Sequence, residues 1–479
     1  MTTVSSQDLL AILPESLLVL TAILLIVADG LRRGRNWTGV LPVISVIGLV
    51  ACGAAAIGNW GQGGTVFEGA VFTDGFSSFF ATLFAIIGTL TVLFSPHYLK
   101  MRSMRLSEYY VVLILAVFGM MVMVKAANLL ILFLGLETMS VALYVLAGFQ
   151  RRDVKSAESG MKYLVMGAFS SGFLLYGIAL LYAVVGSVSY ADIGEYLSAG
   201  YKLGPMLVAG IALLLVGFAF KCAAVPFHFW SPDVYDGAPT TVTAFMSTGP
   251  KAAAFVALIR VFGIALEPAS PLWATAVTWL AILTMTVGNV IALRQTSVKR
   301  MLAYSSIAHA GYLLVGVVAG TDAARVATAY YLAAYALMNL GAFAVIILIN
   351  RRSDSGYAFD DLRGIGFAHP VLGITMSVFL LSLTGIPPTA GFFGKLYVFS
   401  AAVQQGHIAL AVIGLLNSAV AAYYYLRVIV LMYMSRPEGD VVVEQPGIYR
   451  AALVVSSLIV LLIGMFPEQL LRVIALASP

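Results

Sequence analysis

Long runs of apolar residues, separated by short polar segments, are the main pattern of this chain. A helix needs about 20 apolar residues to cross a bilayer. Because runs such as 111–120 are continuous, they favour helices over the ten-residue alternation of a membrane β-barrel. The sequence therefore predicts an all-α polytopic membrane protein with about 14 transmembrane helices. We expect the spans at 9–31, 38–60, 75–95, 109–125, 127–149, 159–186, 205–230, 239–264, 272–293, 300–319, 324–350, 370–401, 408–434 and 449–473.

The composition supports a membrane location. Of the 479 residues, 61% are hydrophobic and 10% are charged, whereas soluble domains carry about 25% charged residues. A soluble enzyme, a nucleic-acid binder, a coiled coil and a disordered hub are excluded. The two cysteines, Cys52 and Cys222, are far apart and form no CxxC, so we expect neither a disulfide framework nor an iron–sulfur site.

Basic residues predict the orientation of the chain. Seventeen Lys and Arg fall in loops on one side of the predicted spans and four on the other, so the positive-inside rule places both termini outside the cytoplasm. The larger group is Arg32, Arg33, Arg35, Lys100, Arg102, Arg105, Arg151, Arg152, Lys155, Arg294, Lys299, Arg300, Arg351, Arg352, Arg363, Arg436 and Arg450, and the smaller is Lys125, Lys202, Arg325 and Arg472. The N-terminus lacks the basic region of a cleaved signal peptide, so we expect its first apolar stretch to remain as a span.

Prolines interrupt two spans at related places. Pro226 lies in span seven, and Pro387 and Pro388 lie in span twelve. Proline removes a backbone donor, so each helix should break or kink there. The breaks are five spans apart, which predicts two inverted five-helix repeats beside an ion pathway. The expected units are 1–106 (helices 1–3), 107–268 (first repeat), 269–435 (second repeat) and 436–479 (helix 14 and the C-terminus). Two ordinary proline kinks are the alternative.

Glu137 lies about ten residues into span five, near the bilayer centre. A lone carboxylate there would take up a proton, so we expect a basic partner, either Lys162 or Lys221. Ionisable residues inside membranes usually mark pathways. A buried ion pair that only holds helices together is the alternative.

Lys221, Lys251 and Lys395 also lie well inside apolar spans. Burial favours the neutral form of an amine, so a buried lysine can gain and lose a proton near neutral pH, which arginine cannot. Snorkelling to the membrane surface is the alternative; it suits Lys162 and Arg260 but is harder to sustain for Lys251.

His309 lies about nine residues into span ten, where imidazole suits a proton relay. A hydrogen-bonded structural histidine is an equally good interpretation. No phosphate-binding loop, metal-spaced His/Cys cluster or haem-ligand pair is present in the sequence, so we expect no cofactor in this chain. Proton movement would then be driven from outside it.

Three segments resemble the antiporter-like membrane subunits of respiratory complex I, the bacterial proton-translocating NADH–quinone oxidoreductase. They are PFHFWSPDVYDGAPTTVTAFMSTGPK (226–251), KRMLAYSSIAHAGYLL (299–314) and SLTGIPPTAGFFGKLYVF (382–399). The resemblance covers nearly the whole chain. Lysine rather than glutamate at 395, and no long lateral helix expected after span fourteen, favour the N-type branch of that family.

The resemblance implies a proton channel in a redox-driven pump of the bacterial inner membrane. By match, its charged axis is Glu137, Lys162, Lys221, Lys251 and Lys395, with His309 carried over beside it. Glu137 and Lys221 would act as a switch. NADH, FMN, iron–sulfur clusters and quinone are expected in partner subunits. The expected partners are an antiporter-like neighbour, small membrane subunits of the complex and the lipid bilayer, with no nucleic acid.

Three other functions remain open from sequence. One is a multisubunit cation/proton antiporter, which is disfavoured because mid-membrane lysines repel cations. Another is a membrane-bound hydrogenase-type pump with the same module. The third is a passive scaffold for neighbouring subunits.

Overall fold

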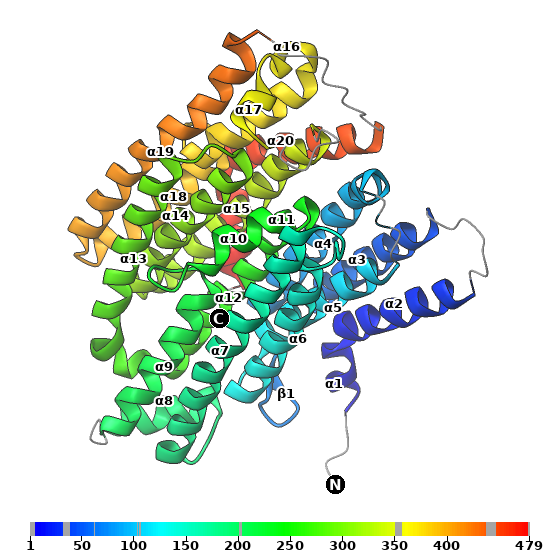
Figure 1. The fold of residues 1–479 in the computed structure, drawn as a ribbon. Helices are drawn as coiled ribbons and strands as arrows, with labels where there is room; N and C mark the ends of the chain where they lie inside the picture. Colours follow the sequence, from blue (N-terminus) through cyan, green and yellow to red (C-terminus); the bar gives the residue numbers. More distant parts are fainter. Residues whose placement is uncertain are drawn as a thin grey trace.

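The computed structural model describes residues 5–31, 39–61, 63–102, 104, 107–200, 204–349, 357–436 and 447–477. Several basic residues used above to orient the chain lie outside these ranges: Arg32, Arg33, Arg35, Arg105, Lys202, Arg351 and Arg352. The described chain is a bundle of long helices with one small hairpin (Figure 1).

Twelve of its helical segments are long and apolar enough to cross a membrane. They are α2 (Leu13–Gly30), α3 (Val40–Gly58), α4 (Gly75–Met101), α5 (Glu108–Lys125), α6 (Leu129–Ala147), α7 (Val154–Val185), the segment of α11 and α12 (Thr240–Ala265), the segment ending in α13 (Glu267–Leu293), α14 (Val298–Ala319), α15 (Asp322–Leu348), α19 (Ile408–Met434) and α20 (Gly447–Met465). The shorter helix α9 (Pro205–Lys221) and the pair α17 (Pro370–Thr384) and α18 (Ala390–Gln404) occupy the predicted seventh and twelfth spans. The count of about fourteen therefore depends on including these interrupted segments.

The two predicted breaks are present. Helix α9 ends at Lys221, five residues before Pro226, and the short helix α10 (Trp230–Gly237) follows. Helix α17 ends at Thr384 and α18 begins at Ala390, with Pro387 and Pro388 between them. The predicted interruptions of the spans 205–230 and 370–401 are therefore confirmed.

The eighth span is also interrupted, which the sequence analysis missed. Helix α11 (Thr240–Met246) ends before α12 (Gly249–Arg260) begins, and a π-helical turn, Val261–Ala265, follows. Pro250 is in the first turn of α12, where its missing N–H costs nothing. Proline in the first turn of a new helix was a readable signal for this break.

Short elements between the spans were not predicted because they are too brief to show a hydrophobic period. They are α1 (Ser6–Ala11), the paired strands β1 (Thr65–Val66) and β2 (Val71–Phe72), α8 (Tyr190–Ser198), α16 (Ile365–Ala368), α21 (Pro467–Ala477) and the 3-10 turns Glu267–Ala269 and Phe359–Leu362.

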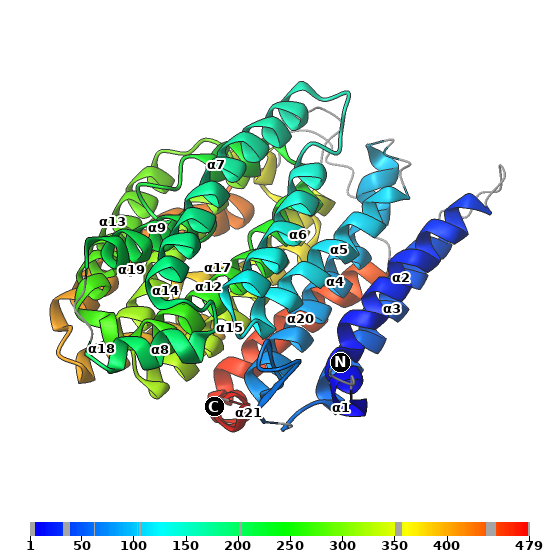
Figure 2. The ribbon, with the colours of Figure 1, turned by 90° about the horizontal axis from the view of Figure 1, so that it is seen from below.

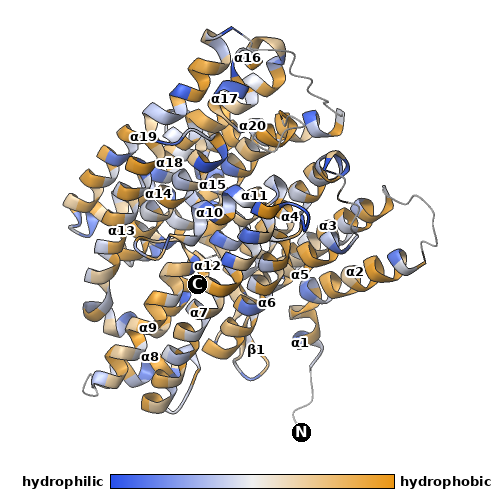
Figure 3. Ribbon diagram, viewed as in Figure 1, coloured by the Kyte–Doolittle hydropathy of each residue, from blue (hydrophilic) through white to orange (hydrophobic). Residues whose placement is uncertain are grey.

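The helices differ sharply in burial. The spans of α11–α12 and α15 are fully buried inside the protein, whereas only 33% of the residues of α2 and α3 are buried. Figure 2 shows α2 and α3 at one edge and both chain ends at the same end of the bundle. Figure 3 shows apolar outer helices, with hydrophilic segments gathered around α10 and α11. Hydrophilic residues therefore gather in the interior of the bundle, and apolar residues cover its outside.

Candidate functional site

Lys221 is the last residue of α9 and is 7% exposed. Its ammonium donates to the Ser140 hydroxyl at 2.7 Å and to the Tyr144 hydroxyl at 3.4 Å. Glu137, one turn before Ser140 on α6, accepts a hydrogen bond from Ser171 of α7. Among the described residues, Glu137 forms no ion pair within 4.0 Å. The expectation that Lys162 or Lys221 is the basic partner of Glu137 stays a prediction, because in this structure hydroxyl groups contact both the Lys221 ammonium and the Glu137 carboxylate.

Lys162 is half-exposed, about two turns into α7, and forms its ion pairs with other residues. It pairs with Glu158 at 2.7 Å and with Asp233 at 3.0 Å, and Asp233 also accepts from Arg300 at 2.9 Å. Asp233 is in α10, outside the spans. Burial alone raises its pKa, but Lys162 and Arg300 outweigh this effect and hold the pKa below its usual 3.8.

Lys251 lies in the first turn of α12 and is 2% exposed. Its ammonium lies 2.6 Å from the Ser306 carbonyl oxygen and 2.5 Å from the Ser306 hydroxyl oxygen, both on α14. Tyr335 of α15 donates to the same hydroxyl at 2.8 Å. A cation near a helix N-terminus is opposed by the helix dipole, so the oxygens of Ser306 must stabilise the charged form.

His309 is buried one turn beyond Ser306 on α14. Its Nδ1 lies 2.8 Å from the Tyr331 hydroxyl and its Nε2 lies 3.1 Å from the Tyr425 hydroxyl. The Tyr335 ring, whose hydroxyl contacts Ser306, is centred 5.1 Å from the imidazole. Both ring nitrogens therefore have a hydroxyl partner, which suits a relay and a structural histidine equally.

Lys395 of α18 is 5% exposed and reaches back to the end of α17. Its ammonium donates to the carbonyls of Leu383 at 3.0 Å and Thr384 at 2.8 Å, and to the Ser418 hydroxyl at 2.7 Å. The last carbonyls of a helix lack intrahelical donors, and the helix dipole favours a cation beside them. The break in span twelve thus builds the binding site for this lysine.

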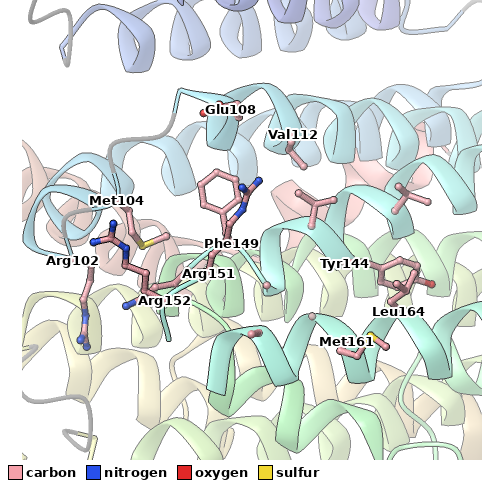
Figure 4. Close-up of a pocket in the computed structure, with 16 residues that line it drawn as sticks. Arg102, Met104, Glu108, Val112, Tyr144, Phe149, Arg151, Arg152, Met161 and Leu164 are labelled. Carbon is pink, nitrogen blue, oxygen red and sulfur yellow. The ribbon is translucent and has the colours of Figure 1, made fainter. Parts of the chain in front are cut away.

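A groove of about 890 Å³ leads toward the Lys221 cluster (Figure 4). Arg102, Arg151 and Arg152 lie at one end of it, and Tyr144 lies at the other. Since Tyr144 contacts Lys221, the groove connects the end of the bundle that carries the basic loops with the buried amine.

Two buried ion pairs were missed from sequence. Lys125, predicted in a loop, is buried and pairs with Glu15 of α2 at 2.8 Å. Arg260, for which snorkelling was considered, is 2% exposed and pairs with Asp74 at 2.7 Å. Each acidic residue lies near the start of a predicted span. An acidic residue at such a position could have indicated a buried ion pair from the sequence.

The described residues hold no group of three or more His, Cys, Asp or Glu able to bind a metal. The three buried lysines of the predicted axis, Lys221, Lys251 and Lys395, are each contacted by oxygens of hydroxyl or carbonyl groups. In the part of the chain that the structure describes, none of the three has a carboxylate within 4.0 Å. Without a nearby carboxylate, a buried amine can exist in both its charged and its neutral form. Proton transfer requires both forms.

A bundle of about fourteen apolar helices, with interrupted spans and carboxylate-free buried lysines, defines an antiporter-like membrane subunit. The family model described as "NADH:quinone oxidoreductase/Mrp antiporter, TM" matches residues 126–421. NADH-quinone oxidoreductase subunit N of Trichlorobacter lovleyi is 46% identical, with 97% of this chain and 96% of that protein covered. Subunit N 2 of Rhizobium meliloti is 40% identical over 97% of both chains. The chain belongs to the family of NADH-quinone oxidoreductase subunit N.

Solved structures agree with this assignment. A chain of respiratory complex I from Thermus thermophilus superposes with a TM-score of 0.83 and 34% identity, over 97% of this chain and 100% of that one. A chain of the Mrp complex from Dietzia sp. has a TM-score of 0.82 at 20% identity, over 97% of both chains, and shares the fold.

Proposed function

We propose that this chain is a proton-translocating subunit of NADH–quinone oxidoreductase, which couples electron transfer elsewhere in the complex to proton movement through its charged axis. The observation that carries the proposal is the set of three buried lysines held by neutral oxygens. Their removal from water favours proton release, and their oxygen partners stabilise the charged form, so both states are accessible. The subunit N relatives and the complex I structure support the assignment.

The path runs along the buried polar groups. Lys251 and His309 lie on the two sides of the Ser306–Tyr335 pair. The Lys395 ammonium lies 4.9 Å from the centre of the Tyr312 ring, which packs edge-on against His309. Protons move from the Lys221 cluster through Lys251 and His309 to Lys395, with water filling the longer steps.

The switch works through hydroxyl groups rather than a direct ion pair. Ser171 holds Glu137, while Ser140 and Tyr144 hold Lys221. Rotation of these hydroxyls or a small movement of α9 brings the two charges together or separates them. Bringing Glu137 closer favours the charged amine, and separating the groups favours proton release.

The orientation and partners complete the proposal. The chain is a multi-pass protein of the bacterial inner membrane, with both termini on the non-cytoplasmic side and the basic loops inside. Its partners are an antiporter-like neighbour and small membrane subunits, and NADH, FMN, iron–sulfur clusters and quinone are held by other subunits. Units 107–268 and 269–435 are the inverted repeats.

The test replaces Lys251 in the assembled complex and measures NADH-linked proton pumping in inverted membrane vesicles. Lys251→Met should lower proton flux about tenfold or more, since a positioned proton-transfer group contributes about 10²–10⁴-fold. Exposed Lys100 gives the matched control, Lys100→Met, which should pump normally. If an assembled Lys251→Met complex pumps at the wild-type rate, the proposed proton-transfer function is contradicted and the passive scaffold is favoured.

A multisubunit cation/proton antiporter is the second candidate, because the Mrp chain shares this fold. A hard cation requires several oxygen ligands, whereas the centre of this bundle carries ammonium groups that repel it. Co-purification of flavin and iron–sulfur subunits with the chain would separate the two functions in favour of the oxidoreductase.

A further inference from the structure

A further buried lysine without a carboxylate partner in the described chain lies outside the charged axis. Lys299, the second residue of α14, was predicted in a loop, yet it is 2% exposed. Its ammonium donates to the carbonyls of Asp236 at 2.9 Å and Ala238 at 2.6 Å, and it lies 5.2 Å from the centre of the Tyr357 ring. Within the described ranges it has no carboxylate within 4.0 Å. It therefore has the same oxygen-only surroundings as the lysines of the axis.

Lys299 faces a polar cavity of about 120 Å³ at the end of the bundle that carries the basic loops. Because a water needs about 10–15 Å³ on this measure, several fit. The charged groups around the cavity are mixed in sign: Arg102, Asp153, Lys155 and Asp236. Lys155 is exposed, so the cavity opens toward the aqueous side.

From Lys299, polar groups continue inward toward Lys251. Ser306 lies seven residues further along α14, about two helical turns and on the same face. Tyr235 of α10, a neighbour of Ser231 and Ser306, donates to the Met246 carbonyl at 3.3 Å. The Ser231 hydroxyl is fully buried beside the Tyr235 hydroxyl and has no partner in the described chain at full hydrogen-bond geometry. A water beside Ser231 would satisfy this hydroxyl and bridge the gap.

We propose that Lys299 is a proton-transfer residue that collects protons from this cavity. The ammonium releases one proton inward, through water beside Ser231 and Tyr235, to Ser306 and Lys251. Lys251 accepts this proton when its own amine is neutral, and the neutral Lys299 amine then takes a proton that the cavity water relays from the aqueous side, so one proton moves and no other reactant is needed. This inference rests on the proposed function, to which it adds an entrance separate from the Lys221 groove.

The competing role is a fixed charge that caps the end of α10 through its two carbonyl contacts. Arginine separates the two roles, because it keeps the charge and the donors but does not release a proton. In the assembled complex, Lys299→Arg should lower NADH-linked proton flux in vesicles several-fold, with subunit content unchanged. Lys299→Met should lose flux as well. Lys100→Met, which removes an exposed amine outside the cavity, should pump normally.

Ser231→Ala is a second test of the proposal, because it removes only the Ser231 hydroxyl and changes the side-chain volume little. We expect a several-fold loss of flux with normal assembly. Wild-type flux in Lys299→Arg overturns the proposal, and so does wild-type flux in Ser231→Ala if the arginine variant does not assemble. Loss of pumping in Lys251→Met combined with normal flux in these variants would refute this entrance alone; normal flux in Lys251→Met would refute the proposed function itself.

Discussion

The ammonium of Lys395 lies 2.8 Å from the carbonyl oxygen of Thr384, the last residue of α17. The lysine is thus held by the break in its own span rather than by an acidic side chain. Any movement between α17 and α18 changes the number of carbonyls that face the amine. Helix geometry at the break is therefore coupled to the preference of Lys395 for its charged or neutral form.

Lys395→Arg tests whether proton release, and not charge alone, is needed there. Arginine keeps donors for the carbonyls of α17 but stays protonated. We expect normal assembly and a proton flux lowered about tenfold or more, measured in vesicles as NADH-linked pumping. Ser418→Ala removes one neutral contact; it should lower the stability of the complex by about 1 kcal/mol and lower the proton flux less than Lys395→Arg does. An arginine variant that pumps like the wild type would show that Lys395 only holds the break together.

The hydroxyl groups that contact Glu137 (Ser171) and Lys221 (Ser140 and Tyr144), called the hydroxyl bridge below, give a second prediction. Ser171→Ala and Ser140→Ala each remove a partner of one charged group, and both should lower proton flux several-fold. Ser170, next to Ser171, is buried without a partner in the described chain. Since removing an unsatisfied buried hydroxyl costs little, Ser170→Ala is the matched control and should pump normally. Equal flux in all three variants would exclude a role for the bridge.

Glu15 and Lys125 predict a stability effect. Removing one partner of a buried ion pair leaves an uncompensated charge and costs about 3–5 kcal/mol. Lys125→Met should therefore reduce the amount of chain in the assembled complex and lower its melting temperature. The double variant Glu15→Gln with Lys125→Met should recover most of the loss, because no isolated charge remains. Thermal melting of the purified complex measures both, and a double variant as unstable as the single one would contradict the pairing.

The sequence predicted the spans and the proline breaks because both depend on local chemistry: continuous apolar runs and a missing backbone donor. It also marked Lys221, Lys251 and Lys395 as buried, since long apolar runs surround them. The break between α11 and α12 was missed although the segment STGPK (247–251) marks it, because two apolar stretches of span length enclose this short polar segment.

The sequence did not predict which residues on different helices contact each other. The 3.0 Å contact of Lys162 with Asp233 joins residues 71 positions apart, and Lys299 looked like a loop residue because nothing local shows that α10 covers it. The Ser140 and Ser171 contacts depend on the relative rotation of α6, α7 and α9, which hydropathy does not encode. Long-range pairing, and not helix formation, was the missing information.

Asp233 gives a pH prediction outside the spans. Its pKa is held below 3.8 by Lys162 and Arg300, so its contribution to stability is present above that value and is lost as the pH falls through the depressed value. The melting temperatures of wild type and Asp233→Asn should differ equally at about pH 7 and pH 5, and converge below about pH 4. Convergence already between pH 7 and pH 5 would contradict a lowered pKa.

The contact between α5 and α6 depends on two glycines. A Cβ on Gly119 would lie 2.4 Å from the Met139 backbone nitrogen, and one on Gly135 would lie 2.5 Å from that of Met123. Small residues allow membrane helices to approach this closely. Gly119→Ala and Gly135→Ala should therefore force the helices apart, at a cost of about 1–3 kcal/mol. Because α6 carries Glu137, proton flux should fall as well.

Gly172 of α7 supplies the matched control, since a Cβ there meets nothing within 4 Å. Gly172→Ala should leave the melting temperature of the complex unchanged or slightly raised, because alanine favours helix by about 1 kcal/mol over glycine. Melting and vesicle pumping of the three variants together distinguish close packing from a general intolerance of alanine. If Gly119→Ala and Gly172→Ala behave alike, the contact between α5 and α6 is not what positions Glu137.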